Sequence, residues 1–380
     1  MKVAIFTDND FDKINGVTTT LTAVLRYAPA DIKPRIYTAS GLASDDPDYL
    51  ALRSFGVSIP FYREMKMYVP HYRQYLERVK RDGIDVLHLT TPGPLGLVAL
   101  WVASQTGLPL VGSFHTDLSA YTTLLSGSER LGSLMREYMR WMYGRCARVL
   151  VPSEATRELL SLARTSADRL QVWTRGVDTT LFSPDRRSAQ LRRDWGVSAE
   201  RPALLYVGRV SREKGLALLP RLQDVLRSRR FAHQLVVVGE GPMQRELADA
   251  CPDAVFTGPL GRDSVAEAFA SADVFVFPSE TDTAGNVVLE AQSAGLPVIV
   301  SSRGGPKENL WHGLSGMVCE EQDPVRWAGA VVDVCGSPAV REAMAISARK
   351  YAHTRRWETA LEPLFQTYRD LNGRSASRAA

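Results

Sequence analysis

Two acidic residues stand at the two ends of a short stretch that leads from an apolar segment into a helical one. Asp282 lies in a polar, Gly-containing loop after residues 273–277, and Glu290 lies about one turn into a helix expected over 287–294. Carboxylates accept hydrogen bonds from hydroxyl groups, so the two side chains could hold a neutral polyol between them. A helix cap and a solvated surface residue would explain an isolated pair equally well.

The same stretch supplies backbone groups that favour an anion. Residues 273–277 are rich in β-branched and aromatic types, which is typical of a buried parallel strand. In an open α/β sheet, ligands bind at the loops that follow such strands. The N–H groups around Gly285, Asn286 and Val287 open the next helix, and amide groups at a helix N-terminus attract negative charge.

Two basic residues follow another expected strand. Arg209 and Lys214 lie in the loop after the apolar run 203–207. Cations in such a loop can balance the charge of a diphosphate, although two solvated charges would look the same in the sequence. Gly239 follows the next expected strand, but Gln244 stands where a dinucleotide-binding fingerprint needs its third Gly.

The first half of the chain holds two further candidates. Gly16 opens a helix after the first expected strand, where a glycine lets the backbone approach a phosphate or sugar closely; a plain tight turn is the alternative. His115 follows the strand expected over 108–113 and, judged alone, would be an ordinary surface histidine. The aspartates at positions 8, 10 and 12 do not form a calcium loop, because the Gly and the bidentate Glu of that loop are missing.

Residues 279–297 resemble the signature of retaining GT-B glycosyltransferases of family four. That signature is matched by Asp282, Gly285, Glu290-Ala291 and Gly295-Leu-Pro297. The first acidic position is usually Glu in the family, and Asp there is similar to the subgroup that glycosylates lipids. Ala284 and Gln292 replace a common Phe and a common Met, so the acceptor side of the site is expected to differ.

The resemblance extends over nearly the whole chain and implies a role for each candidate. It includes Asn-Gly-Val at 15–17, Phe-His-Thr at 114–116, Gly-Arg-x4-Lys-Gly at 208–215 and the loop 258–261, which is similar to the family's nucleobase wall. The implied catalytic residues are Asp282, His115, Arg209 and Lys214. The implied donor-binding residues are Gly16, Arg209, Lys214, Gly239, Leu260, Asp282, Gly285, Asn286, Val287 and Glu290. In this scheme His115 lies beside the donor sugar, Asp282 binds sugar hydroxyls and Glu290 binds the ribose.

The alternation of strand and helix patterns predicts an α/β protein built from two similar halves. The resemblance implies a GT-B fold, with two Rossmann-like parallel-sheet domains, an interdomain cleft and a C-terminal crossover helix. We expect an acceptor-binding domain over 1–185, a nucleotide-sugar-binding domain over 186–355, a crossover helix over 356–371 that packs back on the first domain, and a polar tail over 372–380.

The composition is that of an ordinary globular chain. Of its 380 residues, 45% are hydrophobic and 23% are charged, and no apolar run reaches the length of a transmembrane helix. The first residues enter a strand directly and the four cysteines show no paired spacing, so we expect a cytoplasmic protein without a signal peptide. There is no nucleic-acid-binding motif, and no nucleic-acid partner is expected.

The positive charge is concentrated in one segment. Residues 61–148 contain eleven Lys or Arg and seven Asp or Glu, a difference that equals the net charge of +4 of the whole chain. Aromatic and methionine residues are interleaved with these cations over 61–81 and 130–148, a pattern that suits an anionic membrane surface. Core packing and a solvated helix face are the alternatives. We expect peripheral contact with the inner face of the cell membrane.

The expected reaction is transfer of a hexose from a nucleotide-sugar to a hydroxyl acceptor with retention of configuration. The resemblance to lipid mannosyltransferases favours GDP-mannose as donor and a glycerolipid or glycolipid as acceptor. Alternatives are transfer of glucose, glucuronate or sulfoquinovose from a UDP-sugar to diacylglycerol, a polysaccharide or soluble-sugar acceptor, and a non-catalytic nucleotide-sugar-binding protein. No metal or other cofactor is expected, since Arg209 and Lys214 would neutralise the leaving diphosphate.

Overall fold

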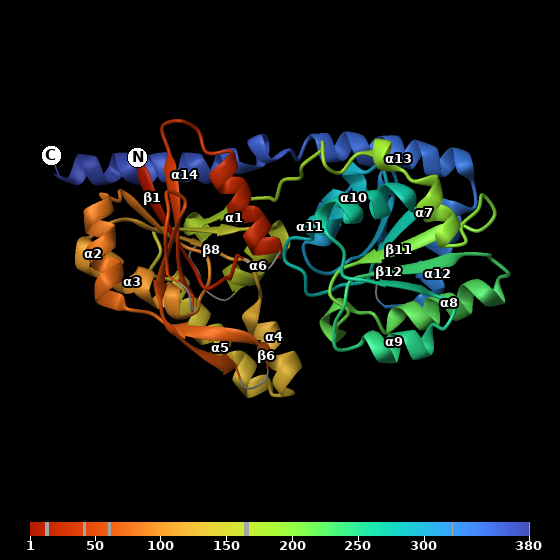
Figure 1. Ribbon diagram of the computed structural model, residues 1–380, viewed down its shortest axis with the longest axis horizontal. Helices are drawn as coiled ribbons and strands as arrows, with labels where there is room; N and C mark the ends of the chain where they lie inside the picture. The colour runs from red at the N-terminus through yellow and green to blue at the C-terminus, as the bar shows by residue number, and fades with distance from the viewer. Residues whose placement is uncertain (12–14, 41–42, 60–61, 163–166, 321, 380) are drawn as a thin grey trace. The chain divides into compact units, whose positions relative to one another are not determined.

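The computed structural model describes residues 1–11, 15–40, 43–59, 62–162, 167–320 and 322–379. The chain divides into two compact units (Figure 1): unit 1 comprises Met1–Arg175 and Ala360–Ala380, and unit 2 comprises Gly176–Thr359. The chain passes from unit 1 to unit 2 after Arg175, which is before the domain boundary expected at residue 185. The boundary is earlier because Val177 and Phe182 are buried in the core of unit 2.

Unit 2 is built on a six-stranded parallel sheet. Its strands are β11 (Ala203–Val207), β12 (Gln234–Val238), β13 (Val255–Gly258), β14 (Val274–Phe277), β15 (Val298–Ser301) and β16 (Gly316–Cys319), in the spatial order β13-β12-β11-β14-β15-β16. The strands are short apolar runs, as expected when helices cover both faces of a sheet. The order reverses between β11 and β14, which is the topological switch point where open α/β sheets bind ligands.

The helices of unit 2 form two groups on the two faces of this sheet (Figure 1). They are α7 (Ala189–Asp194), α8 (Leu218–Ser228), α9 (Gln244–Ala250), α10 (Arg262–Ser271), α11 (Asn286–Ser293), α12 (Pro324–Cys335) and α13 (Pro338–His353). Helix α8 packs on α12, whereas α11 packs on α10 and α13. Helix α11 follows β14, and each of its ends lies one residue before the corresponding end of the helix predicted over 287–294.

Unit 1 holds an eight-stranded sheet in the order β10-β9-β8-β7-β1-β2-β4-β3. Its strands are β1 (Lys2–Thr7), β2 (Lys33–Ser40), β3 (Ser44–Asp45), β4 (Tyr49–Arg53), β7 (Val86–Leu89), β8 (Leu110–Ser113), β9 (Arg148–Val151) and β10 (Leu170–Val172). All of its strand pairs are parallel except β3 with β4. The order reverses between β1 and β7, so unit 1 has a switch point of its own.

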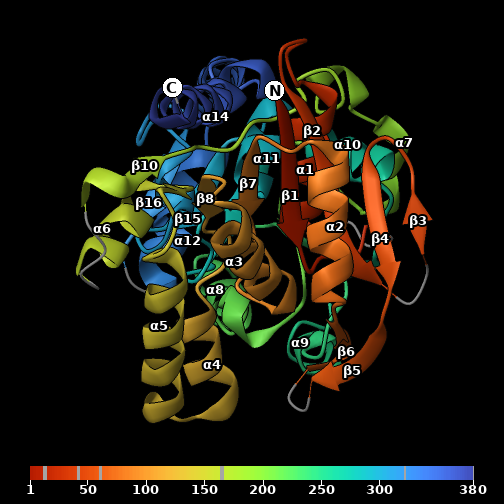
Figure 2. The same cartoon turned by 90° about the vertical axis from the view of Figure 1, so that its left-hand side faces the viewer.

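A glycine separates two successive helices of unit 1. The helices are α1 (Gly16–Arg26), α2 (Tyr72–Asp82), α3 (Pro94–Thr106), α4 (Leu118–Ser126), α5 (Glu129–Tyr143) and α6 (Glu154–Leu162), and α2 and α3 lie side by side (Figure 2). Helix α4 ends at Gly127, whose φ of +66° is left-handed, and Ser128 then caps α5. A glycine at this conformation stops a helix at little steric cost.

Two further elements complete unit 1. Strands β5 (Phe55–Ile59) and β6 (Tyr62–Val69) form a separate antiparallel pair. The C-terminal helix α14 (Trp357–Ala379) spans the residues expected as crossover helix and tail. Its later part belongs to unit 1, where Thr367 hydrogen-bonds Gln171 at 3.1 Å and Arg369 pairs with Asp31 at 2.9 Å.

Candidate active site

Glycines bring the main chains of neighbouring loops together at the switch point of unit 2. A Cβ added at Gly215 would lie 2.5 Å from the carbonyl oxygen of Pro278, which follows β14. Gly239, directly after β12, has a φ of +124°, and a Cβ there would lie 2.1 Å from the carbonyl oxygen of Gly208. Only glycine permits such close approach of backbone to backbone. The loops that carry the predicted residues are therefore fixed to one another through their main chains.

Lys214 and Asp282, predicted as ligands of phosphate and sugar, form an ion pair. The Nζ atom of Lys214 lies 2.9 Å from Oδ1 and 2.8 Å from Oδ2 of Asp282, and the side chains are 17% and 22% exposed. The backbone of Asp282 is also held, because its carbonyl oxygen accepts the N–H of Gly305 at 2.9 Å. A cation able to bind phosphate and a carboxylate able to bind hydroxyl groups thus lie side by side.

Gly285 opens helix α11 in the left-handed conformation, with φ +71° and ψ 48°. A Cβ at this position would come within 3.0 Å of Pro306, so a larger residue would displace one of the two segments. The side-chain amide of Asn309 donates to the carbonyl oxygens of Ala284 and Gly285 and holds the turn. The N-cap residue Gly285 has no side chain with which to cap this N-terminus, and no acidic residue lies in its first turn. A helix end of this kind suits an anion.

Glu290 lies one turn into α11, on the side of α10. Burial raises the pKa of its carboxyl group to about 7, and the positive charge of Arg262 lowers it by a smaller amount. Arg262 is the first residue of α10 and follows the loop in which Leu260 is 37% exposed. A carboxyl group that could bind ribose hydroxyls and an exposed apolar side chain that could cover a base therefore lie at the same edge of the sheet.

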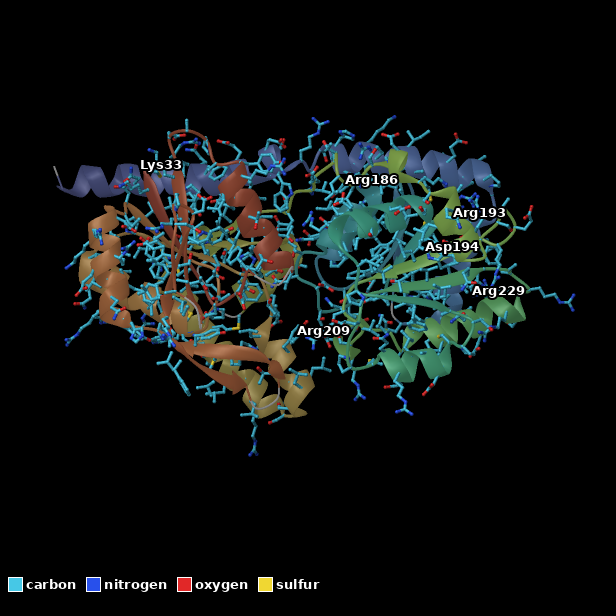
Figure 3. The ribbon with its side chains drawn as sticks, in the orientation of Figure 1. Lys33, Arg186, Arg193, Asp194, Arg209 and Arg229 are labelled. Carbon is cyan, nitrogen blue, oxygen red and sulfur yellow. The ribbon has the colours of Figure 1, made fainter. Side chains whose placement is uncertain are left out.

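Arg209 is the second residue after β11 and is labelled in Figure 3. Its carbonyl oxygen accepts the hydroxyl group of Tyr206 at 2.8 Å, which fixes the start of the loop. At the carboxyl edge of one sheet the structure thus collects Arg209, Lys214, Gly239, Leu260, Asp282, Gly285, Asn286, Val287 and Glu290. The two remaining predicted residues, Gly16 and His115, belong to unit 1.

Gly16 is the first residue of α1, and Asn15 caps that helix. The Oδ1 atom of Asn15 accepts the N–H of Val17 at 2.9 Å and that of Thr18 at 3.0 Å. Thr18 bonds back to the N–H of Asn15, which completes a capping box. Two amide groups beside Gly16 are therefore already used within the helix.

His115 directly follows Phe114 at the end of β8, and both of its ring nitrogens have partners in unit 1. Its Nε2 lies 2.8 Å from Oγ of Ser113, and its Nδ1 lies 3.2 Å from Nη2 of Arg175. Burial lowers the pKa of His115 well below its ordinary value, and the positive charge of Arg175 lowers it further. The imidazole is therefore neutral at physiological pH.

Asp8 lies at the switch point of unit 1 and caps a helix. Its Oδ1 accepts the N–H of Leu95 in α3 at 2.9 Å, and its Oδ2 accepts the hydroxyl group of Thr91 at 2.6 Å. Burial raises the pKa of this carboxyl group. Asp12 lies outside the described residues, and within them no group of three His, Cys, Asp or Glu side chains is placed to hold a metal ion.

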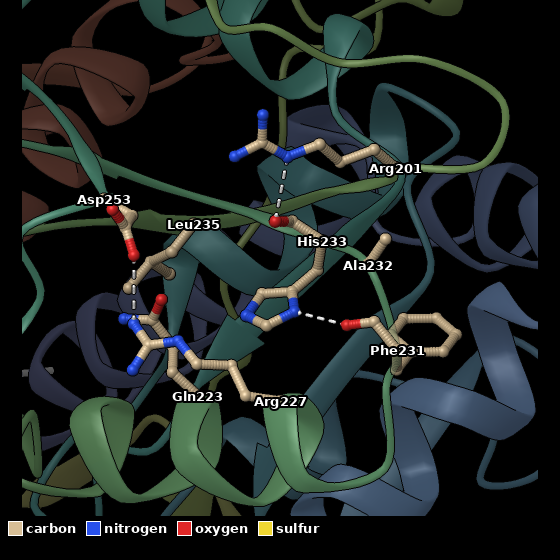
Figure 4. A pocket seen from close by; sticks show the side chains of 8 residues that line it. All are labelled: Arg201, Gln223, Arg227, Phe231, Ala232, His233, Leu235 and Asp253. Carbon is tan, nitrogen blue, oxygen red and sulfur yellow. Dashed lines mark hydrogen bonds and ion pairs between the residues drawn. The ribbon is translucent and has the colours of Figure 1, made fainter.

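A cavity of about 170 Å³ lies at the opposite edge of the sheet of unit 2 (Figure 4). It is lined by Arg201, Gln223, Arg227, Phe231, Ala232, His233, Leu235 and Asp253. Residues 231–235 enter β12 from its amino end, whereas ligands of such sheets bind at the carboxyl ends of the strands. Its arginines are paired internally, with Asp253 at 3.4 Å and with the carbonyl oxygen of His233 at 3.2 Å. The cavity is therefore not a candidate for the donor site.

Several residues of the site region were not predicted from the sequence. Arg262 was missed although it follows the Gly-Pro-Leu-Gly loop, where a basic residue at a helix start is a local signal. Asn309 and Arg175 gave no such signal, because their partners lie 24 or more positions away along the chain. Only the folded chain brings Asn309 to Gly285 in unit 2 and Arg175 to His115 in unit 1.

Two Rossmann-like units with mainly parallel sheets are the architecture of GT-B glycosyltransferases. Among solved structures of this fold, the Anabaena protein HepE in complex with UDP matches with a TM-score of 0.78. The match covers 97% of this chain and 100% of that chain at 19% identity. The GT-B fold predicted from the sequence is thus confirmed.

The chain belongs to glycosyltransferase family 4. The family model described as Glycosyltransferase Family 4 matches residues 14–181, and that described as Glycosyl transferases group 1 matches residues 201–337. A GDP-mannose-dependent alpha-mannosyltransferase of Mycolicibacterium smegmatis is 31% identical over 405 residues, with 100% of each chain covered. A sulfoquinovosyl transferase of Arabidopsis thaliana is 32% identical over 311 residues, which cover 80% of this chain and 60% of the plant protein. The reaction class is therefore glycosyl transfer, as the sequence predicted.

Proposed function

We propose that this enzyme transfers a hexose from a nucleoside-diphosphate sugar to a lipid hydroxyl group, with retention of configuration and with GDP-mannose as donor. The observation that carries this proposal is the Lys214–Asp282 pair at the switch point of unit 2, next to the N-terminus of α11. It offers a cation to a diphosphate and a carboxylate to the hydroxyls of the attached sugar.

The chemical problem is to stabilise an oxocarbenium-like sugar and a departing diphosphate. Arg209, Lys214 and the first-turn amide groups of α11 would take up the negative charge that grows on the leaving group as the anomeric C–O bond breaks. Glu290 would hold the ribose and Asp282 the sugar hydroxyls. The acceptor oxygen bonds the anomeric carbon on the face from which the diphosphate leaves, and the leaving phosphate takes the acceptor's proton. No covalent enzyme intermediate and no metal ion are needed in this scheme.

The choice of donor rests on the relatives. The mannosyltransferase relative matches over its full length, and its name specifies GDP-mannose. The alternative donor is a UDP-linked sugar, favoured by the relative named as a sulfoquinovosyl transferase. The two differ in the base, which the loop around Leu260 would contact, and that loop is mainly apolar and therefore compatible with either base.

A donor comparison tests this proposal. The purified enzyme is incubated with GDP-mannose or with UDP-glucose, UDP-glucuronate or UDP-sulfoquinovose, each with mixed lipid acceptors and with or without a chelator. We expect transfer from GDP-mannose at least about tenfold faster than from any UDP-sugar, and the same rate in the chelator. Transfer only from a UDP-sugar would show that the donor is a UDP-sugar and not GDP-mannose. Complete dependence of the rate on added manganese or magnesium would refute the metal-free scheme. Donor binding without even slow hydrolysis would favour the non-catalytic alternative.

A lipid acceptor requires a surface that reaches the membrane, and unit 1 offers one at the turn between α4 and α5. Leu124, Leu125, Leu131 and Leu134 are 43%, 46%, 45% and 67% exposed there. Arg130 and Arg136 are exposed on the same stretch of α5. Leucines that enter the lipid interface between cations that contact anionic headgroups are typical of peripheral membrane proteins. No helix among the described residues is long and apolar enough to cross a membrane.

The β5–β6 pair presents a second apolar face. Phe55 pairs with Val69 and Val57 pairs with Met67 across the two strands, and all four side chains are between 45% and 75% exposed. Cross-strand partners lie on one face of a sheet. Strand β6 lies at the same end of unit 1 as α4 and α5 in both ribbon views (Figures 1 and 2). The two apolar surfaces therefore share one end of the unit.

The predicted membrane segments are only partly exposed. Tyr75 and Val79 of α2 are buried, and so are Met139 and Met142 of α5. These residues face the core of unit 1 because each helix carries its apolar side chains on one side. The side chains of residues 61–66 lie outside the described part of the chain. The proposed membrane-binding surface therefore contains fewer residues than the segments 61–81 and 130–148 that the sequence predicted.

Liposome binding should depend on the leucines of the α4–α5 turn. We expect wild-type protein to sediment with anionic vesicles at low salt and to be released at high salt. The double variant Leu131→Asp/Leu134→Asp should bind at least about tenfold more weakly, since it places charge in the lipid interface. Leu159→Asp is the matched control, because Leu159 is 46% exposed on α6 of the same unit. Equal binding by both variants, or a wild type that never sediments, would point to a soluble acceptor.

A further inference from the structure

A chain of hydrogen bonds in unit 1 leads from Tyr368 to His115 and on to Arg175. It joins Tyr368 Oη to His88 Nδ1 at 2.6 Å, His88 Nε2 to Ser113 Oγ at 2.9 Å, Ser113 Oγ to His115 Nε2 at 2.8 Å, and His115 Nδ1 to Arg175 Nη2 at 3.2 Å. Tyr368, His88 and Ser113 have no exposed area, and Arg175 is 3% exposed. The chain therefore runs from the C-terminal helix α14, through β7 and β8, to a predicted site residue.

Two contacts, one with Arg175 and one with Ser113, determine the tautomer of His115. A guanidinium group has five N–H donors and no acceptor, so Arg175 must donate to Nδ1 of His115. A neutral imidazole that accepts at Nδ1 carries its hydrogen on Nε2. That hydrogen then points at Oγ of Ser113, which has lone pairs to accept it. The two contacts together select the neutral form with Nε2–H.

The charge of Arg175 acts in the same direction. Its Nη1 donates to the carbonyl oxygen of Trp173 at 2.9 Å, and its guanidinium carbon lies 4.4 Å from the centre of the Trp173 ring. Among the described residues no carboxylate forms an ion pair with it. A buried cation without a counter-ion opposes a second positive charge next to it, so protonation of His115 is disfavoured.

We propose that Arg175 and Ser113, with His88 and Tyr368 behind them, are positioning residues that hold the His115 imidazole as a neutral Nε2–H tautomer. This inference rests on the proposed function and on the role beside the donor sugar that the family resemblance implies for His115. Because both ring nitrogens are engaged within unit 1, the imidazole is held in one orientation and does not accept the proton of the acceptor. That role fits a reaction in which the leaving phosphate takes the proton.

The tautomer can be measured without substrate. In protein labelled with ¹⁵N in the imidazole rings, long-range ¹H–¹⁵N correlation spectra distinguish Nδ1–H, Nε2–H and doubly protonated histidine. The His115 signals are those lost in His115→Gln, and their shift in Ser113→Ala gives a second assignment. We expect a bare Nδ1 and a protonated Nε2 in the ligand-free enzyme near neutral pH. An Nδ1–H tautomer, a doubly protonated ring or an averaged mixture would overturn the inference.

Variants then link the tautomer to turnover. Ser113→Ala and Tyr368→Phe remove hydroxyl groups from the chain, and each should lower kcat by up to about tenfold with little change in the donor KM. Each should also populate a second tautomer of His115. Tyr75→Phe is the control, since it removes a buried hydroxyl group of unit 1 that bonds the carbonyl oxygen of Thr38. An unchanged tautomer with an equal loss in the control would refute the positioning role. A fixed tautomer in a protein that turns over no donor would instead refute the proposed function and leave the positioning chain standing.

Discussion

Asp282→Asn is expected to lower kcat by roughly 100-fold while the affinity for the bare nucleoside diphosphate stays within about threefold of wild type. The carboxylate binds the sugar in our proposal, and the diphosphate carries no sugar. Loss of its charge also releases Lys214, which lies 2.8 Å away, to interact with phosphate. Glu290→Gln should lose turnover as well, but it should weaken diphosphate binding by about 10- to 100-fold, the worth of a charge-assisted hydrogen bond. Calorimetry with the bare diphosphate separates the two variants.

The affinity of the enzyme for the nucleoside diphosphate should also depend on pH, because Glu290 titrates. Its pKa is raised to about 7 by burial, so the free enzyme holds a protonated carboxyl group below that pH and a carboxylate above it. Ribose hydroxyls donate more strongly to the carboxylate, and affinity through this residue should rise between about pH 6 and pH 8. In Glu290→Gln this contribution disappears, while the titration of the ligand phosphate remains and serves as the control.

Equal losses of diphosphate affinity in Asp282→Asn and Glu290→Gln would refute the assignment of one residue to sugar and the other to ribose.

Lys214→Ala and Arg209→Ala are expected to slow turnover by about 30- to 1,000-fold each, which corresponds to roughly 2–4 kcal/mol of barrier. Ground-state binding of the donor should fall much less, because the charge on the leaving diphosphate grows only as the anomeric bond breaks. Steady-state kinetics together with donor affinity from calorimetry give the two effects separately.

Two comparisons make this prediction specific. Arg212→Ala removes an exposed cation from the same turn, η3 (Arg212–Lys214), and should leave turnover nearly unchanged. The double variant Lys214→Ala/Asp282→Asn should be less impaired than the product of the single effects, since the two side chains form one ion pair. A loss in Arg212→Ala as large as in Lys214→Ala, or losses confined to donor affinity, would contradict the proposed stabilisation of the leaving group.

Local sequence patterns were sufficient to predict which loops of unit 2 meet at one edge of its sheet. Asp282, Gly285 and Glu290 belong to one strand–loop–helix segment, and Arg209 and Lys214 belong to another. The pattern of each segment is contained in about a dozen consecutive residues, and parallel strands bring the loops that follow them to a common edge. The two loops therefore had to lie at the same end of the sheet wherever their strands were placed.

The same reasoning could not sort the basic, aromatic segments of the first half. Tyr75 and Leu134 both stand among cations in the sequence, yet Tyr75 has no exposed area and Leu134 is 67% exposed. Which side of a helix meets the core depends on the neighbouring sheet and helices. A pattern of alternating apolar and charged residues is common to a core-packed helix and to a helix that meets a membrane.

From its residues alone, this protein's class, its two-part α/β organisation and the meeting of its candidate loops at one sheet edge could be determined, because each rests on short-range periodicity and turn chemistry. The pairing of Lys214 with Asp282, 68 positions apart, was decided by the fold, as was the contact of Tyr368 with His88, 280 positions apart. Hydrogen bonds of this kind depend on distances of a few tenths of an ångström between side chains on different elements. Only the packing of sheets and helices sets those distances, so the ion pair of unit 2 and the hydrogen-bond chain of unit 1 are properties of the tertiary structure.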